Sequence, residues 1–365
     1  MQTWALFLDA YRELNARKLF WITLVLSGVV VAAFAAVGLN ERGLTILWWQ
    51  LELPLNTTVI SEEVFYKSLF VNLGIGFWLA WLATILALVS TASVFPEMIT
   101  SGSIDLLLSK PLGRWRLFLT KYATGLLFVT LQVAVFCTTS FLVIGWRGNA
   151  WEPAIFLGIP IVVVFYSYLF SICVLLGLIT RSTIASLLLT LLIWVLVFAV
   201  HGTESGLLMA RINADMNVES LERDLHRIDE FREAAEAEDR PLPAWIRGLD
   251  QEREAARTSR DRWRLAHRIA YGVKTAMPKT SETIALLERW MISLAELPDR
   301  EGEEEPPATG ALLSQPSQRV DPQELNMRLA ERIRARSVWW VLGTSLAFEA
   351  VVLALACWIF TRRDY

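Results

Sequence analysis

Long apolar runs alternate with short polar segments along most of the chain, and one long polar segment interrupts this pattern before the last run. Six runs reach the length of about 20 apolar residues that a helix needs to cross a bilayer. Runs of this length predict membrane-spanning helices rather than strands or buried core helices. The predicted spans are residues 19–39, 68–95, 122–146, 154–180, 183–201 and 338–361.

The charges between these runs indicate how the spans are oriented. Four segments that would lie on the same side of the membrane are basic, whereas the loop at residues 40–67 is rich in glutamate. Because basic loops tend to stay in the cytoplasm, both chain termini are predicted to be cytoplasmic. Residues 1–18 can place Trp4 and Phe7 on one face, with Arg17 near the headgroups, which predicts an interfacial entry helix.

The long polar segment, residues 202–337, lies outside the cytoplasm if all six runs span the membrane. Apolar residues recur in it at helical spacing on both sides of Pro241 and Pro243, which predicts an antiparallel helical hairpin. An acidic, proline-rich stretch near 298–322 predicts a disordered linker. Between the hairpin and the linker, an amphipathic helix is expected on the outer membrane surface. Its apolar face consists of Ile284, Leu287, Trp290, Met291 and Leu294.

Composition supports an integral membrane protein and argues against other classes. Hydrophobic residues make up 54% of the chain, more than is usual for a soluble protein. Acidic and basic residues interleave in the polar segment instead of forming a basic stripe, so no nucleic-acid partner is expected. The expected fold is an all-α integral membrane protein in a lipid membrane. Its parts are the interfacial helix at 1–18, spans one to five within 19–201, the extracytoplasmic helical insertion at 202–337, and the sixth span with a cytoplasmic tail at 338–365.

No pattern in the sequence predicts catalysis, metal binding or nucleotide binding. The chain lacks a phosphate-binding loop ending in Gly-Lys-Ser/Thr, a His-Glu-x-x-His pair and a Gly-x-Ser-x-Gly elbow. Its three histidines show no metal-ligand spacing, and its three cysteines all lie within apolar runs. We therefore expect no cofactor and no enzyme activity in this chain, and any ATP hydrolysis is expected on a separate chain.

The stretch from Pro96 to Lys121, between the second and third predicted spans, combines helix-start signals, a helix stop and positive charge. Ser101 is a candidate N-cap, and Pro111 prevents the helix from continuing. A short cytoplasmic helix is therefore predicted near residues 101–110. It would act as a plug for a socket on another protein, or it could rest its apolar side in lipid as an ordinary interfacial loop. Its apolar side would consist of Ile104, Leu107 and Leu108.

This stretch resembles the permease subunits of ABC-2 type transporters. The residues that carry the resemblance are Glu97, Gly102, Leu107, Leu108, Ser109, Pro111, Arg114 and Lys121. In that family the corresponding loop carries a coupling helix, which docks into a separate nucleotide-binding subunit. The resemblance extends over roughly residues 1–201 and 338–365, whereas the insertion is longer than the short segment that family members commonly have there. The coupling residues expected here are Glu97, Gly102, Ile104, Leu107, Leu108, Pro111 and Arg114.

The resemblance implies an ATP-driven transporter, an exporter by the family's general tendency, in a bacterial inner (cytoplasmic) membrane. Its expected partners are an ABC ATP-binding subunit and a second permease, identical or related. The alternative is a membrane-anchored scaffold that recruits an envelope protein through the hairpin in 202–337. A membrane-embedded enzyme is disfavoured, because polar residues do not recur at corresponding depths in the spans.

Glu349 is the acidic residue near the middle of a predicted span. A charge at the centre of a membrane helix costs about 2.5–3.5 kcal/mol on insertion scales. Such a residue is retained at a helix interface or along a transport path, and both roles are open for Glu349. Gln132 in the third span is a candidate hydrogen-bond partner, with simple packing as the other interpretation.

Overall fold

The computed structural model describes residues 18–40, 43–51, 61–100, 113–147, 151–237, 244–291 and 321–362. The predicted entry helix at 1–18 and the predicted linker near 298–322 therefore lie almost entirely outside the described residues, as does the loop at 101–112. The chain divides into two compact units. The first unit comprises Met1–Val197, Pro278–Asp299 and Val341–Tyr365, and the second comprises Phe198–Met277 and Arg300–Trp340.

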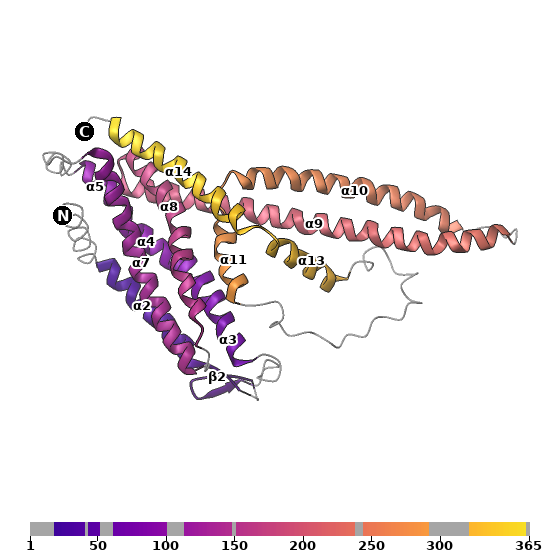
Figure 1. The fold of residues 1–365 in the computed structure, drawn as a ribbon, viewed down its shortest axis with the longest axis horizontal. Helices are drawn as coiled ribbons and strands as arrows, with labels where there is room; N and C mark the ends of the chain where they lie inside the picture. The colour runs from indigo at the N-terminus through magenta and orange to yellow at the C-terminus, as the bar shows by residue number, and fades with distance from the viewer. Residues whose placement is uncertain are drawn as a thin grey trace. The chain divides into compact units, whose positions relative to one another are not determined.

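Six helical segments of the described residues are long and apolar enough to cross a membrane, which confirms the prediction of six apolar helices (Figure 1). Five of them extend beyond the predicted runs, because helices continue past the apolar stretch. The first ends earlier, since a strand begins at Val37. The segments are Lys18–Ala36, Glu62–Ile99, Arg114–Arg147, Pro153–Thr180, Thr183–His226 and Val338–Arg362.

A small antiparallel sheet that was not predicted follows the first span, α2 (Lys18–Ala36), in an otherwise helical fold. Leu47, in the turn between its second and third strands, has a left-handed backbone with φ of 56°. The Leu47 N–H donates to the Ala36 carbonyl at 2.7 Å, so the turn folds back onto the end of α2. The sheet was missed because its strands have only three or four residues. They are β1 (Val37–Asn40), β2 (Gly43–Ile46) and β3 (Trp49–Leu51).

The second span consists of four consecutive helical elements, and its middle is wound as a π-helix. Gly74 in this π-helix permits close packing of two aromatic rings. A Cβ atom added there would lie 3.1 Å from the ring of Phe34 and 3.2 Å from the ring of Phe136. Long π-helical segments are rare and often mark functional sites. The four elements are α3 (Glu62–Leu69), η1 (Phe70–Ala83), α4 (Thr84–Thr91) and α5 (Val94–Thr100).

The fourth span lies at the centre of the first unit. In its most apolar stretch 78% of the residues are buried, against 22% for the last span, α14 (Val338–Arg362). The fourth span begins with a short 3-10 helix, η2 (Pro153–Leu157), and continues as α8 (Gly158–Thr180). It packs against α7 (Arg114–Arg147), the third span.

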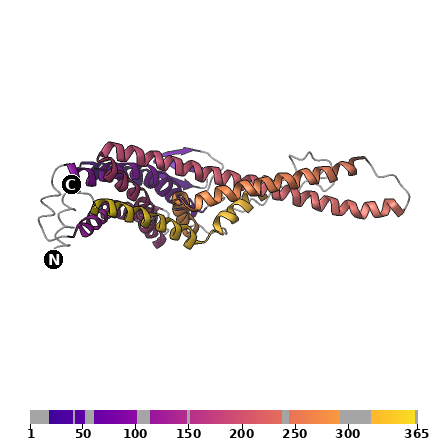
Figure 2. The ribbon, with the colours of Figure 1, turned by 90° about the horizontal axis from the view of Figure 1, so that it is seen from above.

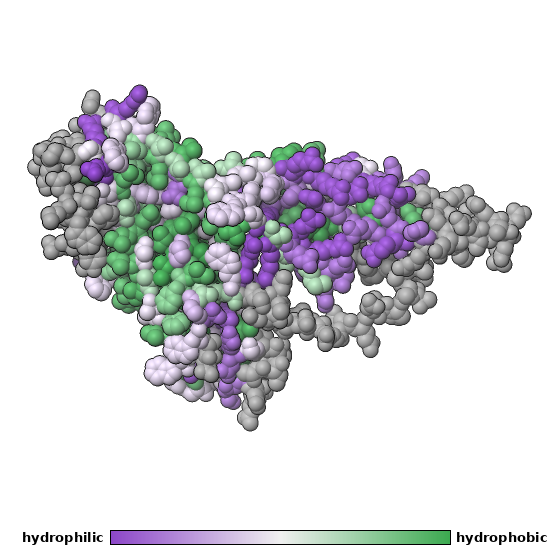
Figure 3. All heavy atoms as spheres, in the orientation of Figure 1, coloured by the Kyte–Doolittle hydropathy of each residue, from purple (hydrophilic) through white to green (hydrophobic). Residues whose placement is uncertain are grey.

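The outer faces of the membrane helices carry exposed apolar side chains. Val25 on α2, Leu188 on α9 (Thr183–Ala237) and Val351 on α14 are 63%, 60% and 69% exposed. In Figure 3 hydrophobic residues dominate the visible surface of the membrane helices, and hydrophilic residues dominate that of the second unit. An apolar surface of this extent is stable in lipid or against a partner chain.

The amphipathic stretch after Pro278 forms α11 (Thr280–Met291), which belongs to the first unit. Leu286, Leu287 and Met291 are buried, and the helix packs on α8 and η1. Its apolar face therefore contacts other membrane helices, whereas the sequence analysis assigned that face to the membrane surface. An amphipathic pattern fits either environment, which explains the difference.

The second unit contains the carboxyl-terminal part of α9, α10 (Ala244–Thr275) and α13 (Pro322–Arg334). In Figures 1 and 2, α9 and α10 lie side by side. Their ion pairs join Glu222 to Arg257 and Asp215 to Arg264, so the two helices run antiparallel. Helix α13 packs on α9 through an apolar cluster. The cluster contains Leu208, Ile212, Met216, Leu325, Leu329 and Ile333.

Candidate functional site

Two helices of the first unit flank the predicted coupling loop. Helix α5 carries Glu97, whose side chain is exposed, and α7 begins at Arg114. The Arg114 guanidinium donates a hydrogen bond to the carbonyl of Thr361, 3.1 Å away in the last turn of α14. A cation at a helix carboxyl end satisfies a carbonyl without an intrahelical partner. The predicted coupling residues Gly102, Ile104, Leu107, Leu108 and Pro111 lie outside the described residues.

Three phenylalanines pack together beside this hydrogen bond. The ring centroids of Phe95 on α5 and Phe118 on α7 are 5.2 Å apart, and Phe360 on α14 lies 5.9 Å from Phe118. All three side chains are buried. Together with Arg114 and Thr361 they form what we call the loop anchor, because they join three helices of the first unit close to the two ends of the loop.

Helix α5 also packs against the end of α8. A Cβ atom added at Gly177 would lie 3.3 Å from the ring of Pro96, so the absence of a side chain there permits the contact. Helix α8 ends at Thr180 and is capped by Arg181, whose left-handed backbone has φ of 54° and whose N–H donates to the Gly177 carbonyl at 2.9 Å. Four helices therefore meet around the two ends of the loop.

Glu349 lies in a contact between α14, α7 and α8, and it is 7% exposed. The Tyr122 hydroxyl donates to its Oε1 and the Ser167 hydroxyl donates to its Oε2, each at 2.8 Å. Among the described residues no cation forms an ion pair with it. The structure thus places Glu349 in a helix interface, and a role along a transport path stays a prediction. We call Tyr122, Ser167 and Glu349 the polar centre.

Aromatic stacking extends the polar centre to α4. The Phe170 ring stacks on Tyr122 at 5.1 Å and on Tyr166 at 5.6 Å, and the Tyr166 and Thr91 hydroxyls are 2.6 Å apart. Helix α7 carries both Arg114 of the loop anchor and Tyr122 of the polar centre, about 12 Å apart along the helix axis at 1.5 Å per residue. The loop anchor and the polar centre are therefore connected through one rigid helix.

Gln132 does not contact Glu349, so the proposed hydrogen bond between them is absent. Its side-chain amide instead donates to the carbonyl of Phe20 at 3.5 Å, which places it between α7 and α2. The interpretation of Gln132 as a packing residue agrees with this position. The actual partners of Glu349 are 227 and 182 residues away in sequence, so no local pattern pointed to them.

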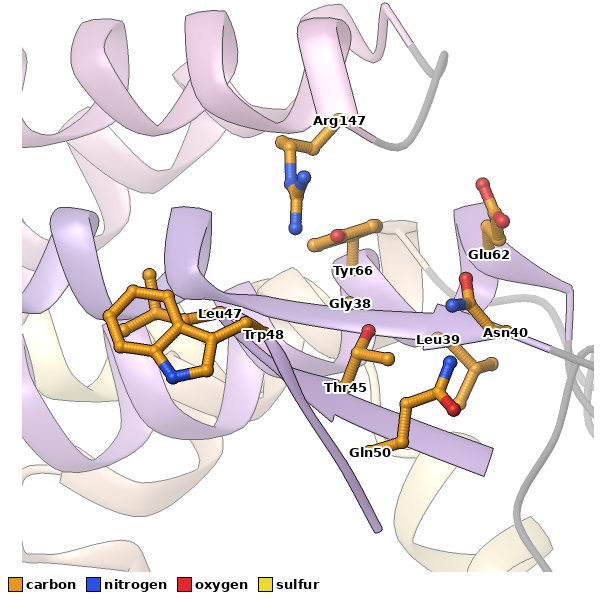
Figure 4. A pocket seen from close by; sticks show the side chains of 10 residues that line it. All are labelled: Gly38, Leu39, Asn40, Thr45, Leu47, Trp48, Gln50, Glu62, Tyr66 and Arg147. Atoms are coloured by element: carbon orange, nitrogen blue, oxygen red, sulfur yellow. The ribbon is translucent and has the colours of Figure 1, made fainter. Parts of the chain in front are cut away.

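A polar pocket of about 550 Å³ lies beside the small sheet and was not predicted (Figure 4). Arg147 points from the end of α7 toward Tyr66, and Asn40, Thr45 and Gln50 project from the strands. One guanidinium together with amide and hydroxyl groups can hydrogen-bond a small polar ligand.

The second unit contains a buried carboxylate that sequence analysis also missed. Glu204 has no exposed side-chain surface, and its oxygens lie 2.5 Å from Lys274 Nζ, 2.6 Å from Arg336 Nη2 and 3.1 Å from His267 Nε2. The signal for this cluster was an acid directly after the fifth apolar run, at a position where it needs cationic partners. The described ranges contain no group of three or more histidine, cysteine or acidic residues that could hold a metal ion.

His267 is held as the neutral Nε2–H tautomer by its neighbours. Its Nε2 lies 3.1 Å from Glu204, which can only accept, and its Nδ1 lies 3.3 Å from Nη1 of Arg211, which can only donate. Burial lowers the pKa of His267 below its ordinary value, and it outweighs the opposing effect of Glu204. Arg211 and Arg336 also favour the neutral ring.

Comparison with known proteins gives one match. The family described as "Protein of unknown function (DUF2705)" matches residues 62–211. No curated protein and no solved structure matches the chain. The matched range includes α5, the start of α7, Tyr122 and Ser167, but not Glu349. Over this range the chain is similar to a family whose function is not assigned.

Proposed function

We propose that this chain is the permease subunit of an ABC-2 type ATP-driven transporter, in which a separate ATP-binding subunit docks on the loop at residues 101–112. The observation that carries the proposal is the loop anchor. Phe95, Phe118 and Phe360 pack at the two ends of this loop, and Arg114 ties α7 to the end of α14. A scaffold has no need for such a connection beneath a cytoplasmic loop.

In this mechanism, closure of two ATP-binding subunits pushes on the loop. Buried aromatic side chains are close-packed and transmit displacement, so α5, α7 and α14 move together. Farther along α7 and α14, the movement reaches the hydrogen bonds of Glu349 with Tyr122 and Ser167. Hydroxyl groups can exchange acceptors at low cost, which suits an interface that changes between two arrangements. A second permease, identical or related, completes the transporter, and export is the expected direction.

Leu107→Asp tests the docking surface. The charge should prevent insertion of the predicted apolar plug, so a stoichiometric ATPase should be lost when the tagged chain is purified from its native membrane in mild detergent. Leu312→Asp is the matched control, because it makes the same change in the predicted linker on the other side of the membrane. Mass spectrometry of the purified complexes gives the readout. Retention of the ATPase by Leu107→Asp would exclude docking through this plug.

Arg114→Met tests transmission separately from docking. It removes the hydrogen bond to Thr361 but leaves the loop residues unchanged. We expect the ATPase to co-purify at the wild-type level and its activity in the complex to respond less to the permease. Wild-type ATP turnover in this complex would show that the anchor is not part of the coupling.

The alternative of a membrane-anchored scaffold draws on the second unit, whose antiparallel helices offer a charged surface. This alternative predicts that no ATPase co-purifies with the chain. An envelope protein should co-purify instead, and it should be lost when residues 202–337 are removed. The same purification therefore decides between the two proposals.

A further inference from the structure

Three helices of the second unit enclose a cationic pocket of about 450 Å³. Five of its eight lining residues are arginines, contributed by α9, α10, α13 and the turn between α13 and α14, and no acidic residue lines it. We call it the arginine pocket. Its arginines are Arg211, Arg264, Arg268, Arg332 and Arg336.

The positive charge of the arginine pocket is only partly neutralised. Asp215 lies 2.7 Å from Arg264 and 3.7 Å from Arg211, and Glu204 pairs with Arg336 while also serving Lys274. Arg268 and Arg332 are exposed, and neither forms an ion pair or a hydrogen bond with any described residue. Two guanidinium groups therefore face the pocket with no negative charge assigned to them, which favours an anionic ligand.

The walls of the arginine pocket are formed before any ligand binds. Leu208, which lines the pocket, belongs to the apolar cluster that packs α13 on α9. Outside the pocket, Arg328 of α13 lies 2.8 Å from Glu219 of α9, and Arg257 of α10 lies 2.7 Å from Glu222. A site built from side chains on packed helices loses little conformational entropy on binding, which favours affinity.

The arginine pocket lies close in sequence to a membrane boundary. Arg336 comes two residues before α14 begins at Val338. Trp339 is 86% exposed, and Trp340 stacks on Tyr271 of the pocket with ring centroids 5.1 Å apart. Tryptophan and tyrosine concentrate at the level of lipid headgroups, so the pocket is expected near that level.

We propose that the arginine pocket binds the phosphate group of an anionic lipid headgroup. Guanidinium groups match phosphate oxygens in paired hydrogen bonds and bind them more specifically than a point charge does. A phosphate between Arg268 and Arg332 would supply the negative charge that these two residues lack. The surrounding volume has room for a headgroup, and the proximity to the membrane boundary favours a lipid over a soluble phosphate compound. The inference does not depend on the proposed transport function.

The test uses the full chain in a neutral detergent, titrated with short-chain phosphatidylglycerol, short-chain phosphatidylcholine or glycerol phosphate. Binding is read from the rise in the thermal unfolding midpoint with ligand concentration. We expect phosphatidylglycerol to bind and the other two to bind at least about tenfold more weakly. In Arg268→Gln/Arg332→Gln the affinity should fall by about tenfold or more for each arginine replaced, the usual range for charge-assisted hydrogen bonds. Arg262→Gln, an exposed arginine of α10 outside the pocket, is the matched control and should bind like the wild type.

Each outcome has a defined meaning. Equal binding of phosphatidylglycerol by the double variant and the wild type overturns the proposal, as does the absence of binding to both phosphatidylglycerol and glycerol phosphate. Equal affinity for glycerol phosphate would show that the pocket takes soluble phosphate compounds and that the assignment to lipid is wrong. Both replaced side chains are exposed, so the variants should fold, and their unfolding midpoints without ligand check this.

Discussion

Two buried carboxylates among the described residues, Glu349 in the first unit and Glu204 in the second, are satisfied by different chemistry. Glu349 in the membrane unit receives hydrogen bonds from two neutral hydroxyls and forms no ion pair with a described residue. Glu204 in the second unit is surrounded by Lys274, Arg336 and His267, all within 3.1 Å. Both residues are less than 10% exposed, so burial alone does not determine how a carboxylate is satisfied.

The difference follows from the surroundings that each helix can supply. The spans around Glu349 contain almost no cations, because a charge within a membrane helix is expensive, so hydroxyl groups are the available donors. The helices around Glu204 are rich in arginine and lysine, and this buried carboxylate forms ion pairs with two of these side chains. Breaking a buried ion pair by removing one partner is strongly destabilising. Glu204 should therefore contribute strongly to the stability of the second unit. Glu349 should contribute less, so that the helices at its interface can move relative to one another.

Glu204→Gln should have the largest effect on stability. It keeps the shape of the side chain but removes the negative charge shared by Lys274 and Arg336, whose side chains are 1% and 11% exposed. We expect a loss of about 3–5 kcal/mol in the free energy of unfolding, the range for a broken buried pair. Chemical unfolding of the purified chain, followed by helical circular dichroism, measures it.

Glu219→Gln is the matched control for this prediction. Glu219 pairs with Arg328 at 2.8 Å, but both side chains are more than a third exposed. A pair of this kind contributes less than about 1 kcal/mol. Similar losses for both variants would mean that the cationic surroundings of Glu204 do not stabilise the unit.

Glu349→Gln should have a smaller effect on stability, although its site is equally buried. The amide can still accept a hydrogen bond, and each hydroxyl has a second acceptor. The Ser167 carbonyl lies 3.1 Å from the Tyr122 hydroxyl, and the Val164 carbonyl lies 2.8 Å from the Ser167 hydroxyl. We expect a loss of about 1 kcal/mol, the value of one neutral hydrogen bond. The same unfolding measurement checks it.

Tyr122→Phe provides a matched comparison for Glu349→Gln, because it removes the donor instead of the acceptor. Its loss should be similarly small. If Glu349→Gln cost as much as Glu204→Gln, the contrast between the two carboxylates would be wrong. Glu349→Gln also tests the transport role of Glu349. Wild-type ATPase coupling in this variant would show that the carboxylate takes no part in the mechanism.

The spans could be predicted from sequence because crossing a membrane is a property of each segment alone. A run such as 183–201 is recognised as a membrane span by its length and apolar composition alone. The sheet at Val37–Leu51 could not be recognised in this way, since its strands are too short to display a period. The amphipathic face of α11 was visible, but the pattern does not distinguish lipid from protein as its partner.

The candidate sites were predictable only as individual residues. Glu349 was identified as a candidate residue because a charge in a membrane span is costly. Its hydrogen-bond partners, however, depend on how α7, α8 and α14 are rotated against one another. Gln132, the partner suggested by sequence, points instead to α2. Glu204 was overlooked because its partners are 63 to 132 residues away. Long-range pairing of this kind follows from tertiary packing and leaves no local periodicity.

The smallest expected effect is a pH dependence of stability caused by His267, the neutral member of the Glu204 cluster. Its pKa in the folded chain lies below the ordinary value of 6.5, so between these two values the unfolded chain binds more protons than the folded chain. The stabilising contribution is therefore complete above about pH 6.5 and declines as the pH falls below it.

His267→Gln should flatten this decline, because Gln can donate to Glu204 and accept from Arg211 without titrating. His226→Gln, which replaces an exposed histidine of α9, should keep the wild-type slope. Unfolding midpoints of the three proteins between about pH 5 and pH 8, the range in which histidine titrates, give the comparison. Parallel slopes for His267→Gln and the wild type would mean that His267 does not favour the neutral ring in the folded cluster.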